Sequence, residues 1–163
     1  MNKVYAGIGS RQTPPHILKK MTLYGAEMAS KGFYLRSGNA QGADQAFALG
    51  ANSVDPGKVL LYLPWKRYEE QAIVEGNHYF FNPHNQFEDA AIKLVKELHP
   101  APEKLSQGAL KLHSRNVAIL LGNRLDRPVE LVVYWSPKGE AIGGTGMGLR
   151  IAKKFGIPTL FLE

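Results

Sequence analysis

The chain contains 163 residues, and its 20 lysines and arginines outnumber its 14 aspartates and glutamates, which gives a formal net charge of +6. Hydrophobic residues make up 44% of the chain and charged residues 21%, a balance that is typical of one folded domain and excludes a disordered chain. Cysteine is absent, which excludes disulfides, thiolate catalysis and cysteine-ligated metal centres. We expect a single domain over residues 1–163, in the cytoplasm, with no membrane-spanning segment and with an anionic partner.

Short apolar runs alternate with longer amphipathic segments along the chain. The predicted elements are, in order, a strand at 4–8, a helix at about 14–31, a strand at 33–37, a helix at about 42–51, a strand at 58–63, helices at 87–98 and about 103–121, a strand at 129–135, a helix at 144–155 and a strand at 158–162. Residues 64–85 are predicted to be irregular and aromatic. The alternation predicts an α/β fold, a Rossmann-like doubly wound and mainly parallel sheet with helices on both faces.

Ligands of such sheets bind beyond the carboxyl ends of the strands, near the point where the strand order reverses. Four loops occupy those positions, after residues 8, 37, 63 and 135, and three of them are rich in glycine. We expect these three loops to converge on one edge of the sheet.

The loop after the first strand contributes four candidate phosphate-binding residues, Gly7, Gly9, Ser10 and Arg11. Glycine lets the backbone approach a ligand closely, and the backbone N–H groups of the following turn are suited to holding a phosphate. Arg11 adds a cation that can bind two phosphate oxygens at once. A tight structural turn is the alternative explanation of this loop.

The loop after the second strand has two glycines four residues apart, between a strand and a helix. Its candidate phosphate-binding residues are Ser37, Gly38, Asn39, Gly42, Ala43 and Asp44. The Gly-Lys-Ser/Thr ending of a P-loop is missing, so hydrolysis of Mg-ATP is not indicated. Asp44 falls in the first turn of the helix, where it either orders the loop or contacts a ligand hydroxyl.

Four glycines within six residues open the last helix, at 143–148. Each costs roughly 1 kcal/mol in a helix interior relative to alanine, which indicates that a ligand or another backbone approaches closely there. The candidate phosphate-binding residues of this loop are Gly143, Gly144, Thr145 and Gly146.

A further candidate pair, Arg115 and Asn116, lies in the helix before the fourth strand. No acidic residue stands three or four positions from Arg115 to pair with it on the helix surface. Arg115 therefore either contacts a base or a phosphate, or is a solvated surface arginine. The five histidines, at 16, 78, 84, 99 and 113, show no metal-binding spacing, and we expect neither a metal nor another cofactor.

In this order, the four features resemble the Rossmann-like domain shared by DNA processing protein A (DprA) and the Lonely Guy (LOG) nucleotide hydrolases, the SLOG superfamily, with the DprA core the most similar. Residues 9–11 are similar to the element that ends the first DprA strand, and residues 37–44 look like its Ser-Gly-x-Ala-x-Gly-x-Asp element. The resemblance implies a protein that binds a nucleotide or single-stranded DNA, with phosphate held by the glycine-rich loops. It is also compatible with a homo-oligomer.

The alternative implied by the resemblance is a LOG-like N-glycosidase or phosphoribohydrolase, which needs a carboxylate to stabilise an oxocarbenium-like transition state. When the LOG glycine-rich turn is aligned on residues 143–147, Leu149 and Arg150 stand where the catalytic glutamates lie. The remaining candidate catalytic carboxylates are Asp44 and Glu140. A third alternative is a sensor or carrier of a nucleotide-derived signal. The aromatic residues between 65 and 81 either stack on bases or form a small satellite core.

Overall fold

The chain folds into alternating strands and helices, as a computed structural model shows for residues 2–81 and 87–163. The strands are β1 (Val4–Gly9), β2 (Tyr34–Ser37), β3 (Val59–Tyr62), β4 (His78–Phe80), β5 (Leu131–Trp135) and β6 (Thr159–Phe161). The helices of four residues or more are α1 (Pro15–Ser30), α2 (Ala43–Val54), α3 (Glu88–Leu98), α4 (Gln107–Leu121) and α5 (Gly143–Phe155).

All six strands belong to one parallel sheet, in the order β4-β3-β2-β1-β5-β6. The chain first builds outward from β1 through β2, β3 and β4, and then returns to add β5 and β6 on the other side of β1. The strand order therefore reverses between β1 and β5, which pair in register from Tyr5 opposite Leu131 to Gly9 opposite Trp135. The predicted doubly wound α/β fold is confirmed.

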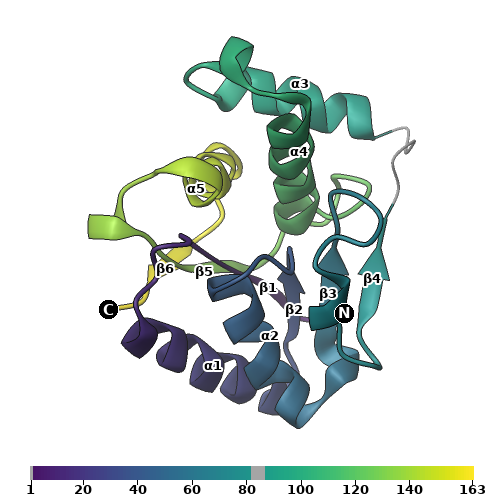
Figure 1. Ribbon diagram of the computed structural model, residues 1–163, viewed down its shortest axis with the longest axis vertical. Helices are drawn as coiled ribbons and strands as arrows, with labels where there is room; N and C mark the ends of the chain where they lie inside the picture. The colour runs from purple at the N-terminus through teal and green to yellow at the C-terminus, as the bar shows by residue number, and fades with distance from the viewer. Residues whose placement is uncertain (1, 82–86) are drawn as a thin grey trace.

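Helices cover both faces of the sheet, with α1 and α2 on one face and α3, α4 and α5 on the other (Figure 1). Side chains of β1 alternate between the two layers, as the pleat of a strand requires. Tyr5 is fully buried in the α1/α2 layer, and Ala6 is fully buried in the opposite layer. Gly25 and Gly50 let α1 and α2 pack closely, because a Cβ atom at Gly50 would collide with the backbone oxygen of Thr22.

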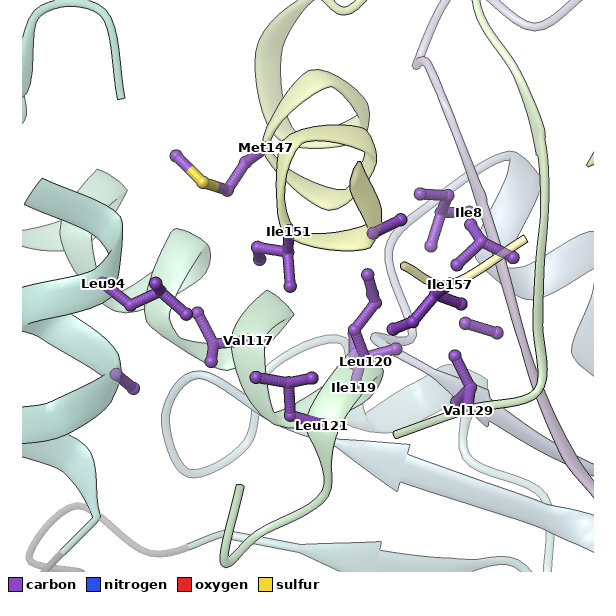
Figure 2. Close-up of a cluster of buried hydrophobic side chains, with 14 of the residues drawn as sticks. Ile8, Leu94, Val117, Ile119, Leu120, Leu121, Val129, Met147, Ile151 and Ile157 are labelled. Carbon is purple, nitrogen blue, oxygen red and sulfur yellow. The ribbon is translucent and has the colours of Figure 1, made fainter. Parts of the chain in front are cut away.

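The second layer is held by aliphatic side chains of β1, β5, α3, α4 and α5, and Figure 2 shows most of this cluster. Ile8 of β1, Leu120 of α4 and Ile151 of α5 are all less than a tenth exposed. Each such side chain contributes about 1.5–3 kcal/mol when it is fully buried. Helix α5 lies close to β1 because Gly148 has no side chain; a Cβ atom there would lie 2.7 Å from Ile8 Cδ1. This packing fixes the start of α5 beside the end of β1.

The prediction of an irregular segment over 64–85 is wrong for two stretches. Residues 78–80 form β4, which extends the sheet beyond β3, and Glu70–Ala72 form one turn of 3₁₀ helix. All three side chains of β4 are exposed, so the strand carries no hydrophobic alternation that a sequence pattern could reveal. His84 lies outside the described residues.

The predicted helix from about 103 to 121 begins later, at Gln107. Ser106 caps it, its Oγ accepting a hydrogen bond of 3.1 Å from the backbone N–H of Ala109, and a separate 3₁₀ turn covers Pro102–Lys104. The other predicted boundaries differ from the observed ones by three residues or fewer. No helix within residues 2–81 and 87–163 is long and apolar enough to cross a membrane.

Candidate functional site

A cleft of about 410 Å³ opens at the carboxyl ends of β1 and β5, where the strand order reverses. It is formed by the loops after β1 and β2, the first turn of α5 and one side of α4. The predicted site residues that line it are Gly9, Ser10, Arg11, Asp44, Arg115, Asn116, Gly143, Gly144 and Thr145. All three glycine-rich loops thus contribute to one cleft, so their predicted convergence is confirmed. The volume is in the range of small-molecule sites, about 300–1,000 Å³.

Other predicted residues are not among those that line the cleft. These are Gly7, Ser37, Gly38, Asn39, Gly42, Ala43 and Gly146. Two of these glycines are required by packing within the protein. A Cβ atom at Gly7 would lie 2.6 Å from the Phe47 ring, and one at Gly146 would lie 2.5 Å from the backbone carbon of Ala141.

The first turn of α5 presents unpaired backbone N–H groups to the cleft. No side chain caps this helix end, and its first turn contains no acidic residue. Unpaired N–H groups at the positive end of a helix dipole form a ready site for an anion. Gly143 has a φ of +59°, a left-handed conformation that favours glycine at this entry to the helix.

Thr145 lies at the same helix end and lines the cleft, although only 6% of its surface is exposed. Its hydroxyl group is not among the buried polar atoms that lack a partner, and no hydrogen bond engages it within the described residues, so it is open to the cleft. Such a hydroxyl group can both donate to and accept from a ligand. Thr145 is therefore an unused polar group beside the α5 amides.

The loop after β1 holds the opposite wall of the cleft. The backbone N–H of Ser10 donates a 3.1 Å hydrogen bond to the carbonyl oxygen of Trp135, which joins the ends of β1 and β5. The Ser10 Oγ atom accepts a hydrogen bond of 3.0 Å from the backbone N–H of Gln12. Arg11 is exposed and lines the cleft, so its guanidinium group is available to a ligand.

Asp44 orders the loop after β2, one of the two roles that the sequence left open. Its Oδ2 atom accepts a 3.1 Å hydrogen bond from the backbone N–H of Ala40, and only 8% of the residue is exposed. Burial raises the pKa of the Asp44 carboxyl group, and the nearby Arg115 guanidinium, with the backbone N–H groups of Ala40 and Gly38, opposes that rise. Asp44 also lines the cleft, where it is the one acidic residue among the described lining residues.

Arg115 is a buried arginine, which excludes the second of its two alternatives, a solvated surface side chain. Its Nη1 atom donates hydrogen bonds to the backbone oxygens of Gly38, at 2.5 Å, and Tyr62, at 2.9 Å. Its guanidinium carbon lies 5.4 Å from the centre of the Tyr68 ring. Arg115 therefore joins α4 to the ends of β2 and β3 at the floor of the cleft.

On α4, sequence reasoning identified Arg115 and Asn116 but missed the other residues of the same helix face, Ala109, Leu112 and His113. Ala109, Leu112, His113 and Asn116 all line the cleft. Their spacing of three and four residues is that of one helix face, and this spacing was the available signal. Burial lowers the pKa of His113, and His99, Arg150 and Arg115 lower it further. The His99 and His113 ring centres are 5.2 Å apart.

Tyr68 also lines the cleft. On sequence grounds it was treated together with the other aromatic residues between 65 and 81 and was not predicted as a site residue. It packs at the margin of the α1/α2 core as well. Trp65 contacts it edge to face, with ring centres 5.3 Å apart. Tyr79 and Phe80 lie on the edge strand β4 instead.

The second candidate carboxylate, Glu140, is exposed and is not among the residues that line the cleft. Arg150, one of the two residues aligned with the LOG glutamates, donates a 3.2 Å hydrogen bond from Nη2 to the backbone oxygen of Ala141. Across residues 2–81 and 87–163, no group of three His, Asp or Glu side chains comes together as a metal site would require.

Comparison with known proteins gives structural matches alone, since no protein-family model and no curated protein matches the sequence. DNA processing protein A from Helicobacter pylori, studied for its single-stranded DNA binding mode, superposes with a TM-score of 0.63 and 17% identity over 99% of this chain and 65% of its own. DprA from Streptococcus pneumoniae superposes with a TM-score of 0.60 and 16% identity, over 99% of this chain and 50% of its own. The Moco carrier protein from Chlamydomonas reinhardtii superposes with a TM-score of 0.60 and 13% identity, over 99% of this chain and 76% of its own.

These matches confirm the resemblance at the level of the fold, which this chain shares with DprA and with the Moco carrier protein. The chain spans about two thirds of the Helicobacter pylori protein and half of the Streptococcus pneumoniae protein. At 13–17% identity the likeness carries no further than the fold.

Proposed function

We propose that the cleft binds a nucleotide through its phosphate group, either as a free mononucleotide or as one unit of a single strand of DNA. The observation that carries this proposal is the uncapped start of α5, whose free N–H groups lie beside the unpartnered hydroxyl of Thr145 in a cleft of nucleotide size. The phosphate oxygens accept from the α5 amides and from Thr145, and Arg11 at the rim adds charge.

The charge of the cleft supports an anionic ligand. Two arginines, Arg11 and Arg115, line it together with one acid, Asp44, which is already held by the backbone of its own loop. The chain as a whole carries a net charge of +6. Because Asp44 and Arg115 interact with each other, Arg11 is the arginine of the described lining whose charge remains for an anion.

The apolar part of the cleft suits a base or a sugar. Ala109 and Leu112 of α4 and the half-exposed Ile142 line the side of the cleft next to the α5 amides. Ligand sites commonly combine such apolar walls with a few polar groups that fix orientation. The structures of DprA add support, because the Helicobacter pylori protein binds single-stranded DNA.

Titration calorimetry with AMP and fluorescence anisotropy with a labelled oligothymidylate test this function. Each titration is done at about 50 mM and at about 300 mM salt, because binding along a strand weakens steeply with salt whereas a mononucleotide site responds weakly. We expect Arg11→Ala and Thr145→Ala each to weaken binding by about tenfold. Arg124→Ala, which removes an exposed arginine outside the cleft, is the matched control and keeps wild-type affinity.

Absence of binding to both ligands, or an equal loss in Arg11→Ala and Arg124→Ala, contradicts the proposal. The AMP samples are also analysed for free adenine. Release that disappears in Asp44→Asn would assign the cleft an N-glycosidase reaction instead of binding alone, since Asp44 is the one carboxylate among its described lining residues.

A further inference from the structure

Arg115 and Asn116 are neighbours on α4, and their side chains are joined by a hydrogen bond. The Nε atom of Arg115 donates to Oδ1 of Asn116 over 3.1 Å. Because this bond occupies the carbonyl end of the Asn116 amide, it determines which end is the NH₂ group. That group, Nδ2, is directed at α5, where it lies 3.5 Å from the backbone oxygen of Gly144.

The contact between Asn116 Nδ2 and Gly144 is at the outer limit of hydrogen-bond length. Among the described residues, no shorter acceptor serves this NH₂ group. Asn116 thus holds a donor beside the first turn of α5, on the cleft side, with its second N–H unused. A phosphate at the α5 amides lies within reach of that donor.

Arg115 is well suited to hold this amide, because its own side chain is held by burial and by hydrogen bonds to the backbone. It is 9% exposed, and both N–H groups of its Nη1 are used by the backbone oxygens of Gly38 and Tyr62. A Cβ atom at Gly38 would lie 2.6 Å from the guanidinium carbon, so the group also packs directly against the backbone. The position of Nε, and with it that of the Asn116 amide, is fixed by the ends of β2 and β3.

We propose that Asn116 Nδ2 donates a hydrogen bond to an oxygen of the bound phosphate group, and that Arg115 is the positioning residue for this contact. The inference rests on the proposed function for the identity of the ligand. The neutral amide donates a directed hydrogen bond to the phosphate, and Arg115 holds that amide in place.

A double-mutant cycle with AMP as the probe tests the coupling. Arg115→Lys keeps the positive charge but removes the Nε donor, and Asn116→Ala removes the amide. We expect each single variant to weaken AMP binding by about tenfold, and the double variant to bind no more than about twofold more weakly than Asn116→Ala. Losses that multiply in the double variant would show that Arg115 contacts the phosphate independently, and would overturn the proposal.

Asn116→Asp keeps the side-chain oxygen that accepts from Arg115 and removes the NH₂ group that is proposed to donate to the phosphate. The aspartate still accepts from Arg115 Nε, but it offers no N–H to the phosphate or to the backbone oxygen of Gly144, and thermal denaturation measures what the second loss costs. We expect AMP affinity to fall by more than tenfold. Wild-type affinity in this variant would exclude Asn116 as a ligand contact.

The order of the Asn116 side chain gives a readout that needs no ligand and that a purely stabilising arginine would not alter. By NMR relaxation, the Asn116 side-chain amide of the free wild-type protein is expected to be as rigid as the backbone, and in Arg115→Lys to become mobile. Arg36→Lys is the matched control. Arg36 is also buried, but it donates to the backbone oxygens of Ile119 and Arg127 and makes no bond to Asn116.

The two readouts separate the inference from the function on which it rests. If the wild-type protein does not bind AMP while the amide still loosens in Arg115→Lys alone, the ligand is wrong and the positioning role stands. If the Asn116 amide is equally rigid in Arg115→Lys and in the wild type, the positioning role is wrong whatever the cleft binds.

Discussion

A hydrogen bond of 2.9 Å from Asn39 Nδ2 to the backbone oxygen of Glu69 joins the loop after β2 to the loop after β3. Both residues have left-handed backbone conformations, with φ values of +61° and +46°. Asn39 is 1% exposed and also accepts, at its backbone oxygen, a 3.1 Å hydrogen bond from Gln45 Nε2. A residue that the sequence suggested for phosphate binding thus holds together two loops at the cleft edge.

Replacing Asn39 is expected to destabilise the protein by two separable effects. Asn39→Ala loses the bond to Glu69 and places a non-glycine residue without a polar side chain in the left-handed region, for a combined loss of about 2–3 kcal/mol in the free energy of unfolding. Asn39→Gly loses the bond but tolerates the conformation, so it should lose about 1 kcal/mol less. Urea unfolding measures the free energy of unfolding of both variants. Equal losses would show that the left-handed conformation at Asn39 does not disfavour alanine.

Two glycines of the cleft are expected to respond differently to alanine. A Cβ atom at Gly9 would collide with Cβ of Ala43, so Gly9→Ala should lower the free energy of unfolding by about 1–3 kcal/mol. At Gly144 the nearest atom to an added Cβ is Asn116 Nδ2, at 3.4 Å, so Gly144→Ala should change stability by about 1 kcal/mol or less.

The same Gly144→Ala variant is expected to weaken AMP binding by about tenfold, because its methyl group stands where the phosphate approaches the α5 amides. Thermal denaturation and calorimetric titration of one sample give both quantities. Stable protein with unchanged affinity would place the phosphate elsewhere in the cleft.

His113 is expected to make stability depend on pH. Burial and the neighbouring His99, Arg150 and Arg115 lower its pKa below the ordinary value of 6.5, so the folded protein binds this proton less readily than the unfolded chain. The free energy of unfolding should therefore fall as the pH drops below about 6.5. His113→Gln should lose less stability between about pH 7.5 and about pH 5 than the wild type in urea unfolding. Identical losses in the two proteins would show that His113 does not titrate in this way.

The salt bridge between Lys154 of α5 and Glu97 of α3 should contribute little. The two charged atoms are 2.5 Å apart, but the side chains are 38% and 55% exposed. Exposed pairs of this kind contribute about 0–1 kcal/mol. Glu97→Gln should change the free energy of unfolding by less than about 1 kcal/mol, and a larger loss in low-salt thermal denaturation would mean that the pair is effectively shielded from solvent.

The sequence predicted the elements whose signal is local. The central strands are continuous apolar runs, and the glycine-rich loops stand out because glycine is unfavourable in a helix start without a structural reason. The role of Arg115 had no local signal, since its partners Gly38 and Tyr62 are 77 and 53 residues away along the chain. Strand β4 was missed because backbone pairing with β3, rather than side-chain burial, defines it.

The crossing of α1 and α2 through Gly25 and Gly50 leaves no room for these helices to slide, because any side chain at either glycine would meet the backbone oxygen of the other helix. The N-terminal ends of these two helices follow the loops after β1 and β2, and Asp44 lies in the first turn of α2. One side of the cleft is consequently a fixed platform with a constant spacing between its two loops.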